Sequence, residues 1–294
     1  MTPLTQRDIF AHQQQVPWPN LRQVEQDLLL CRAMTALFDD AFLKTQISMR
    51  GGTLPHKIHL APASRYSEGI DLVVIGDRPD EHVRKAINRI LLGVFGRPTS
   101  SAWQAVKLAV RNAVKPSKVL RVIYRVPSVA DPRSTPLEIV IEANVTERKS
   151  YRPISLLPFS YLFRDEIVAT TVNGFEIHEM LGTKMRALFQ RRQGRDLFDL
   201  YWALTEAGTP VNPAEIIELF LYYLQQEGTV ATRDEFIGLL QSHLNDRGFL
   251  TDMMRYCERV LPMIRLWQVI LSSAVCLSCY LKKIRYEMLI YAVW

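Results

Sequence analysis

The sequence has few of the features that mark secreted or membrane-spanning proteins. Its 294 residues include four cysteines, too few and too unevenly spread for a disulfide framework. The first residues, MTPLTQRDIF, show no basic segment followed by an apolar one, so we expect no signal peptide. The apolar run Leu266–Leu281 would rise only about 24 Å as a helix, short of the roughly 30 Å core of a bilayer. We interpret it as a buried or partner-binding helix, with a membrane contact or an altered C-terminus as alternatives, and expect a cytoplasmic protein without stable membrane association.

The composition is that of a globular protein. Hydrophobic residues make up 48% of the chain and charged residues 22%, with a mean hydropathy of -0.02. This length suffices for one large domain or two ordinary ones. The formal net charge of +6 and the pI near 9.2 favour a polyanionic partner such as nucleic acid.

The most informative stretch runs from Met49 to Ile75. It reads as a strand, a Gly51-Gly52-Thr53 turn, a short helix containing Pro55, a loop and a second strand. Glycines let a backbone come close to phosphate, and the free N–H groups of such a turn attract anions. Asp71, early on the second strand, could then hold a phosphate-bound metal ion.

The remaining pattern predicts strands and helices around this stretch. A helix capped by Asn20 carries Cys31, which we expect to be a small buried residue. Further helices are expected at Pro79–Phe95 and Ala102–Val114, and strands at Gln46–Arg50, Ile70–Ile75, Lys118–Val126, Pro136–Glu142 and from about Ile167. Beyond that last strand the pattern is helical throughout.

Two glutamates share one face of the strand Pro136–Glu142. Glu138 and Glu142 are four residues apart, so both side chains point the same way. For Glu138 a solvent-facing position is favoured. For Glu142 two interpretations stay open. It faces solvent, or it shares a metal ion with Asp71 from a neighbouring strand.

A second informative stretch runs from Phe175 to Leu204. If one helix continues through it, Lys184 and Arg191 lie about 20° apart around the axis and could serve one phosphate, whereas Glu179 lies about 140° from Lys184. Glu179 is therefore expected to orient or cap. The basic cluster comprises Arg186, Arg191, Arg192 and Arg195. Its ordinary alternative is a solvated helix with weak internal ion pairs.

Together these stretches resemble the AbiEii/AbiGii toxin family of nucleotidyltransferases, which share the DNA polymerase β-type fold. The resemblance covers about residues 20–205 and is carried by QVEQDLLLCRAMTALFDD, MRGGTLPHKIHL, RYSEGIDLVVI, IEANV and EIHEMLGTKMRALFQRRQGRDLFDLYW. It implies an α+β fold, with a catalytic domain at 1–165, a mixed sheet flanked by helices, and an all-helical domain at 166–294. It also implies a toxin of a toxin–antitoxin or abortive-infection system, with a cognate antitoxin. The implied reaction moves a nucleoside monophosphate from NTP to RNA, with the tRNA 3′ end as acceptor and Mg²⁺ or Mn²⁺ as cofactor.

The resemblance assigns a role to each matching residue. Asp71 and Glu142 correspond to metal-binding carboxylates, and Asp71, Lys184 and Asp196 to catalytic residues. Glu179 and Asp199 are supporting residues. The nucleotide would be bound by Gly51, Gly52, Thr53, Arg65, Ser67 and Lys184, and the RNA by the basic cluster.

The chain departs from the family pattern at Gly69. The family reads R-Y-S-E-D-I-D-L, whereas this chain has Gly69 in place of the first aspartate. That aspartate would bridge two metal ions. Glu68 is a poor substitute, because successive strand side chains point to opposite faces. An Asp at position 69 is expected to raise activity. The alternatives are an impaired NTP- or RNA-binding relic, and an enzyme that nucleotidylates a small molecule or a protein.

Overall fold

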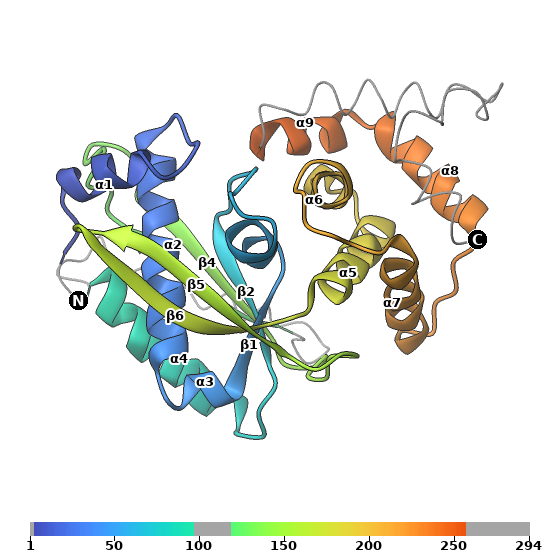
Figure 1. The fold of residues 1–294 in the computed structure, drawn as a ribbon, viewed down its shortest axis with the longest axis horizontal. Helices are drawn as coiled ribbons and strands as arrows, with labels where there is room; N and C mark the ends of the chain where they lie inside the picture. The colour runs from blue at the N-terminus through green and yellow to red at the C-terminus, as the bar shows by residue number, and fades with distance from the viewer. Residues whose placement is uncertain (1–2, 97–118, 257–294) are drawn as a thin grey trace. The chain divides into compact units, whose positions relative to one another are not determined.

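The computed structural model describes residues 3–96 and 119–256, and it has the expected α+β fold (Figure 1). The chain divides into two compact units. Unit 1 comprises the residues up to Ile58 together with Tyr66–Phe175, and unit 2 comprises His59–Arg65 together with the residues from Glu176 onward. The helix expected at Ala102–Val114 and the apolar run Leu266–Leu281 lie outside the described residues.

Unit 1 contains a six-stranded mixed sheet in the order β3-β4-β2-β1-β6-β5. β2 and β4 pair in parallel, as do β1 and β6, whereas β1–β2, β3–β4 and β5–β6 are antiparallel. The strands are β1 (Ile47–Arg50), β2 (Gly69–Val74), β3 (Val119–Val126), β4 (Leu137–Asn144), β5 (Ser155–Phe163) and β6 (Glu166–Gly174).

Helices cover one face of this sheet. The helices of unit 1 are α1 (Gln6–Gln13), α2 (Leu21–Asp39), α3 (Leu43–Gln46), the π-helix η1 (Pro55–His59) and α4 (Asp80–Phe95). α2 packs against β2, β4 and β6, and α4 packs against α2 and β3 (Figure 1). Ile70, Leu72 and Val74 of β2 are buried, so the alternation of the strand places Asp71 on the opposite face. The core thus presents Asp71 away from α2 and α4.

One strand was not predicted from the sequence. β5 contains Pro158, and a proline inside an apolar run argues against a central strand. β5 lies at the edge of the sheet, where a missing backbone donor is tolerated. β6 then continues the sheet to Gly174, beyond the expected boundary at residue 165, because it pairs with both β1 and β5.

Unit 2 is helical in its described part. It contains α5 (Ile177–Gln190), α6 (Gly194–Thr205), α7 (Pro213–Gln226), α8 (Arg233–Leu244) and α9 (Arg247–Tyr256). α5 and α7 pack closely, since a Cβ atom at Gly182 would lie 2.7 Å from the Cβ of Leu219. The capping box at Thr232 and Glu235 is present at the start of α8.

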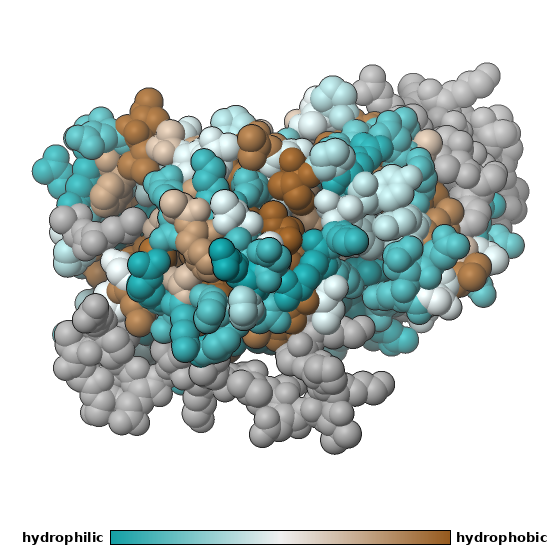
Figure 2. Space-filling model, turned by 90° about the horizontal axis from the view of Figure 1, so that it is seen from below, coloured by the Kyte–Doolittle hydropathy of each residue, from teal (hydrophilic) through white to brown (hydrophobic). Residues whose placement is uncertain are grey.

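Hydropathy varies over the face of the molecule that Figure 2 draws. On the face drawn in Figure 2, hydrophobic residues reach the surface in separate places among hydrophilic ones. Within residues 3–96 and 119–256, no helix is both long and apolar enough to cross a bilayer.

Candidate functional site

Four charged residues form a row across the sheet of unit 1. Arg50 of β1 is the register partner of Asp71, Asp71 is the partner of Glu142, and Glu142 is the partner of Arg121 on β3. Register partners on adjacent strands are about 5 Å apart and point to one face. Two carboxylates therefore lie side by side, with an arginine on each side. Arg121 Nε lies 3.2 Å from Glu142 Oε1, and Arg50 is paired with Glu147 at 2.8 Å.

The two glutamates of β4 differ in their strand partners. Both face arginines on β3, since Glu138 pairs with Arg125 at 2.8 Å much as Glu142 pairs with Arg121. Only Glu142 of the two has a register partner on β2, and that partner is Asp71. This pairing favours the metal-sharing interpretation of Glu142, whose role stays a prediction.

The glycine turn lies directly against Asp71. The N–H of Gly52 donates to Asp71 Oδ2 at 3.3 Å. Gly51 has φ +77, and a Cβ atom there would come 1.9 Å from Asp71 Oδ2. Two features therefore require glycine at position 51: its backbone is left-handed, and the carboxylate of Asp71 lies where a side chain would begin. The turn and the predicted metal ligand form one structure.

Thr53 and Ser67 tie this turn to the start of β2. The hydroxyl groups of Thr53 and Ser67 are 2.5 Å apart, and the Thr53 hydroxyl also donates to the carbonyl oxygen of Gly69. Ser67 Oγ donates to the same carbonyl at 3.4 Å. Both side chains were predicted to bind nucleotide; here they position the turn, and their contact with a nucleotide stays a prediction.

Gly69 is closely packed against β4. A Cβ atom at this position would lie 2.2 Å from the carbonyl oxygen of Val140 and 3.1 Å from its Cβ. The obstacle is backbone, so a side chain at position 69 requires a strand to move. This geometry opposes the expectation that an aspartate at position 69 would simply restore a missing ligand.

The donor set of unit 1 fits one divalent ion. Carboxylate oxygens are the ligands that Mg²⁺ and Mn²⁺ prefer, and Asp71 and Glu142 supply them from register-paired positions. A bridging carboxylate for a second ion would have to come from position 69, which the backbone of Val140 closes. The residues therefore fit a one-ion centre and do not fit the two-ion centre of the family pattern.

Unit 2 holds Lys184 between two buried carboxylates. Lys184 Nζ lies 3.0 Å from Asp196 Oδ1 and 3.0 Å from Asp199 Oδ2. Neither aspartate side chain is exposed to solvent. Arg65 clamps Asp199 from the other side, with Nη2 at 2.8 Å from Oδ2. The structure thus brings together four of the predicted site residues in unit 2.

Arg191 completes this network. Its Nε lies 2.9 Å from Asp196 Oδ2 and its Nη2 3.2 Å from Asp196 Oδ1. Burial opposes ionisation of Asp196, but the charges of Lys184 and Arg191 outweigh it and lower the pKa of this carboxyl. Asp196 is therefore an anion at neutral pH.

The single helix expected through Lys184 and Arg191 is wrong. α5 ends at Gln190, Arg191 is extended at φ -144 and ψ 150, and α6 begins at Gly194. Glycine is unfavourable inside a helix, and Gly194 follows the break between α5 and α6. The extended backbone at Arg191 lets its side chain reach Asp196. The two basic residues meet at Asp196 and not through helical spacing.

The other predicted residues of unit 2 have structural partners. Glu179 is buried and accepts a hydrogen bond from the Tyr223 hydroxyl. The remaining arginines of the basic cluster each lie near a carboxylate, in the pairs Arg186–Glu227 at 3.2 Å, Arg192–Asp246 at 3.6 Å and Arg195–Asp252 at 3.3 Å. These pairs join separate elements and do not lie within one solvated helix, as the alternative had it, and RNA binding by the cluster stays a prediction.

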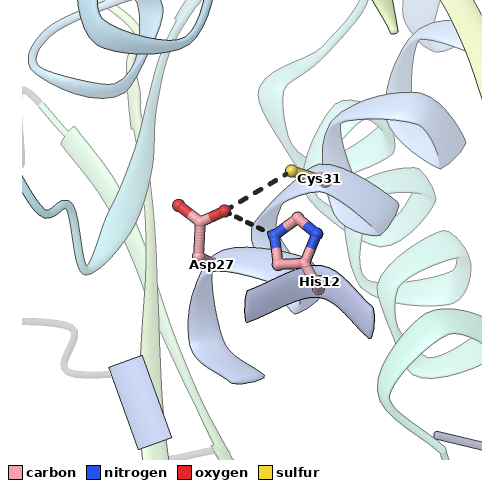
Figure 3. A group of neighbouring side chains, drawn as sticks. All are labelled: His12, Asp27 and Cys31. Atoms are coloured by element: carbon pink, nitrogen blue, oxygen red, sulfur yellow. Dashed lines mark hydrogen bonds and ion pairs between the residues drawn. The ribbon is translucent and has the colours of Figure 1, made fainter. Parts of the chain in front are cut away.

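Sequence reasoning missed several charged residues. Arg50 and Arg121 flank the carboxylates, and only the strand register reveals them. A buried group of potential metal ligands also lies in unit 1, formed by His12, Asp27 and Cys31 (Figure 3). Asp27 and Cys31 are four residues apart on α2, which places them on one face of that helix, whereas no spacing links His12 of α1 to them.

A mixed sheet that carries neighbouring strand carboxylates beside a glycine turn is the arrangement of a nucleotidyltransferase. The chain belongs to the AbiEii family: a family model described as "Nucleotidyl transferase AbiEii toxin, Type IV TA system" matches residues 32–270. Among solved structures it is similar to MenT4, a nucleotidyltransferase toxin from Mycobacterium tuberculosis H37Rv, with 14% identity and a TM-score of 0.51 over 80% of this chain and 77% of that one. JHP933 from Helicobacter pylori has 13% identity and a TM-score of 0.46, over 76% of this chain and 82% of that one. No curated protein matches the chain.

Proposed function

We propose that this chain is a toxin that transfers a nucleoside monophosphate from an NTP to RNA in the cytoplasm, with the tRNA 3′ end as acceptor. A cognate antitoxin would be its partner. Membership of the AbiEii family supports the toxin and transferase parts of this proposal, and the net charge of +6 supports a polyanionic acceptor. The observation that carries it is the pairing of Asp71 with Glu142 beside the glycine turn.

In unit 1, Asp71 and Glu142 would hold one Mg²⁺ or Mn²⁺ ion. When bound, the ion would neutralise charge on the triphosphate and stabilise the departing pyrophosphate. The glycine turn, whose Gly52 N–H donates to Asp71, would hold the triphosphate beside this ion. Arg50 places a further positive charge beside Asp71 in the row. This chain's own contribution is positioning and charge neutralisation.

In unit 2, the network supplies positive charge. Lys184, Arg65 and Arg191 contribute three cations to the two carboxylates of Asp196 and Asp199. We assign Lys184 to a nucleotide phosphate, with Asp196 and Asp199 fixing the direction of its ammonium group. Held between two carboxylates, this ammonium loses little conformational freedom when it binds a phosphate.

Incubation of the protein with tRNA, Mg²⁺ and each labelled NTP in turn tests the function. We expect label at the 3′ end of tRNA with one or more of the NTPs, and none with Asp71→Asn, which keeps the size of the side chain and removes its charge. Absence of any labelled RNA with the wild-type chain would refute RNA transfer. Label that appears in protein or in a small-molecule acceptor would instead support the enzyme with another acceptor.

Gly69 favours a second candidate, a nucleotide-binding relic. A chain with a closed ligand position can retain the glycine turn and bind NTP without turning it over. Calorimetry separates the two candidates, because a relic binds NTP with little dependence on Mg²⁺, whereas an active site requires the ion. Binding that needs Mg²⁺, together with transfer, would exclude the relic.

A further inference from the structure

Unit 1 contains a buried charged cluster that the proposed reaction does not use. We call it the Lys57 cluster: His12, Asp27, Cys31 and Lys57 (Figure 3 draws the first three). Asp27 lies at its centre, with His12 Nε2 2.8 Å from its Oδ2 and Lys57 Nζ 2.8 Å from its Oδ1. Cys31 Sγ lies 3.2 Å from Lys57 Nζ. The exposed fraction of the side chain is 3% for Asp27 and 9% for Lys57.

His12, Asp27 and Cys31 could hold a metal ion by type and spacing, but a cation is already present. The ammonium of Lys57 contacts both the carboxylate and the thiol. Burial raises the pKa of the Cys31 thiol to about 12, so the thiol is protonated at neutral pH. Burial opposes the charges of Asp27 and Lys57, yet their mutual attraction lowers the pKa of Asp27 and raises that of Lys57. The Lys57 cluster is thus centred on an ion pair in which the charges of Lys57 and Asp27 balance each other.

Lys57 extends from the segment that follows the glycine turn. It lies on η1, a few residues after Gly52 and Thr53. Two contacts tie the turn to β2, from the Gly52 N–H to Asp71 and from the Thr53 hydroxyl to the carbonyl of Gly69. The Lys57–Asp27 pair adds a tie to α2, on the helical side of unit 1. The segment from the turn to η1 is therefore held from both a strand and a helix.

We propose that Lys57 is a positioning residue for the nucleotide, which with Asp27 fixes the segment that carries the glycine turn. This inference rests on the proposed function, since it assumes that the turn binds the triphosphate. Removal of Lys57 leaves the buried charge of Asp27 without its main counter-charge. The tie of η1 to α2 through Lys57 and Asp27 is then lost, while the contacts of the turn to Ser67 and β2 remain.

Two variants test the pair. We expect Lys57→Met and Asp27→Asn each to weaken binding of triphosphate at least about tenfold, because small displacements of a positioning group are costly. The double variant should be no weaker than the weaker single variant, since both remove the same tie. Binding is measured by calorimetry with ATP, GTP, CTP, UTP and inorganic triphosphate in turn, well below the melting temperature of each variant.

A matched control separates positioning from stability. Arg164→Met breaks another ion pair with a buried aspartate in unit 1, Arg164–Asp8, whose contacts lie on α1 and at the tip of the β5–β6 hairpin. It should lower Tm and leave triphosphate binding unchanged. If Lys57→Met also lowers Tm without weakening binding, Lys57 has only a structural role and the inference fails.

Two further measurements keep the inference apart from the proposed function. Lys57→Met should speed backbone hydrogen exchange in residues 51–59 without any nucleotide, and Arg164→Met should not. Unchanged exchange would overturn the inference even if the wild-type chain is active. A wild-type chain that binds none of the probes refutes the proposed function instead. A cobalt–thiolate absorption band that is lost in Cys31→Ser would show a metal site, and would also overturn the inference.

Discussion

A Cβ atom at Gly69 would lie 2.2 Å from the carbonyl oxygen of Val140, its register partner on β4. A side chain at position 69 would thus point into the backbone of β4 at Val140. Relative to the pattern R-Y-S-E-D-I-D-L, the chain therefore has no carboxylate at position 69, and β4 leaves no space for a side chain there. We therefore predict that an aspartate at position 69 alone does not create a two-ion centre, in contrast to the expectation from the sequence.

Substitution of Gly69 tests this closure. Gly69→Ala and Gly69→Asp should both destabilise the protein by about 1–3 kcal/mol, since each adds the same Cβ to a packed position. Gly69→Asp should not bind a second Mn²⁺ ion. Thermal unfolding and counting of bound Mn²⁺ by electron paramagnetic resonance check the two parts. Two bound ions and higher activity in Gly69→Asp would show that β4 can move aside.

Glu142 and Glu138 provide a matched pair of substitutions on one strand. Both glutamates face β3 arginines, but only Glu142 of the two pairs with Asp71. Glu142→Gln should reduce nucleotide transfer on the order of 100-fold, because it removes a carboxylate ligand of the ion that would stabilise transition-state charge. Glu138→Gln should leave transfer nearly unchanged. Initial rates at saturating NTP and a range of Mg²⁺ concentrations measure this, and equal losses in both variants would contradict the assignment.

Lys184 should matter for stability as well as for binding. Lys184→Met leaves Asp196 and Asp199 buried with less counter-charge, and breaking a buried pair in this way costs about 3–5 kcal/mol. Arg192→Met is the control, because its pair with Asp246 is exposed and 3.6 Å long, and it should leave Tm nearly unchanged. Urea unfolding measures both variants. A Lys184→Met protein as stable as the wild type would show that the network contributes little.

The sequence predicts the local parts of the site well and the non-local parts poorly. The glycine turn and Asp71 follow from a continuous stretch, and the face shared by Glu138 and Glu142 follows from strand alternation. The pairing of Glu142 with Asp71 depends on two strands that are distant in sequence. The closure at Gly69 depends on Val140 for the same reason. Local pattern also failed at β5, where an edge position accepts Pro158.

The buried network of unit 2 should make stability depend on pH in the acid range. The pKa of Asp196 is lowered in the folded protein because Lys184 and Arg191 outweigh its burial. A carboxyl with a lowered folded pKa stabilises the fold at pH values above its unfolded pKa, about 3.9, and loses this contribution as the pH falls toward the folded value. In Asp196→Asn the side chain at position 196 has no carboxyl group, so it does not titrate in this range. The difference in unfolding free energy between the wild type and Asp196→Asn should therefore be largest at neutral pH and shrink below about pH 4. Urea unfolding at a series of pH values measures it, and a difference that stays constant or grows with acidity would show that Asp196 is not held as a buried anion.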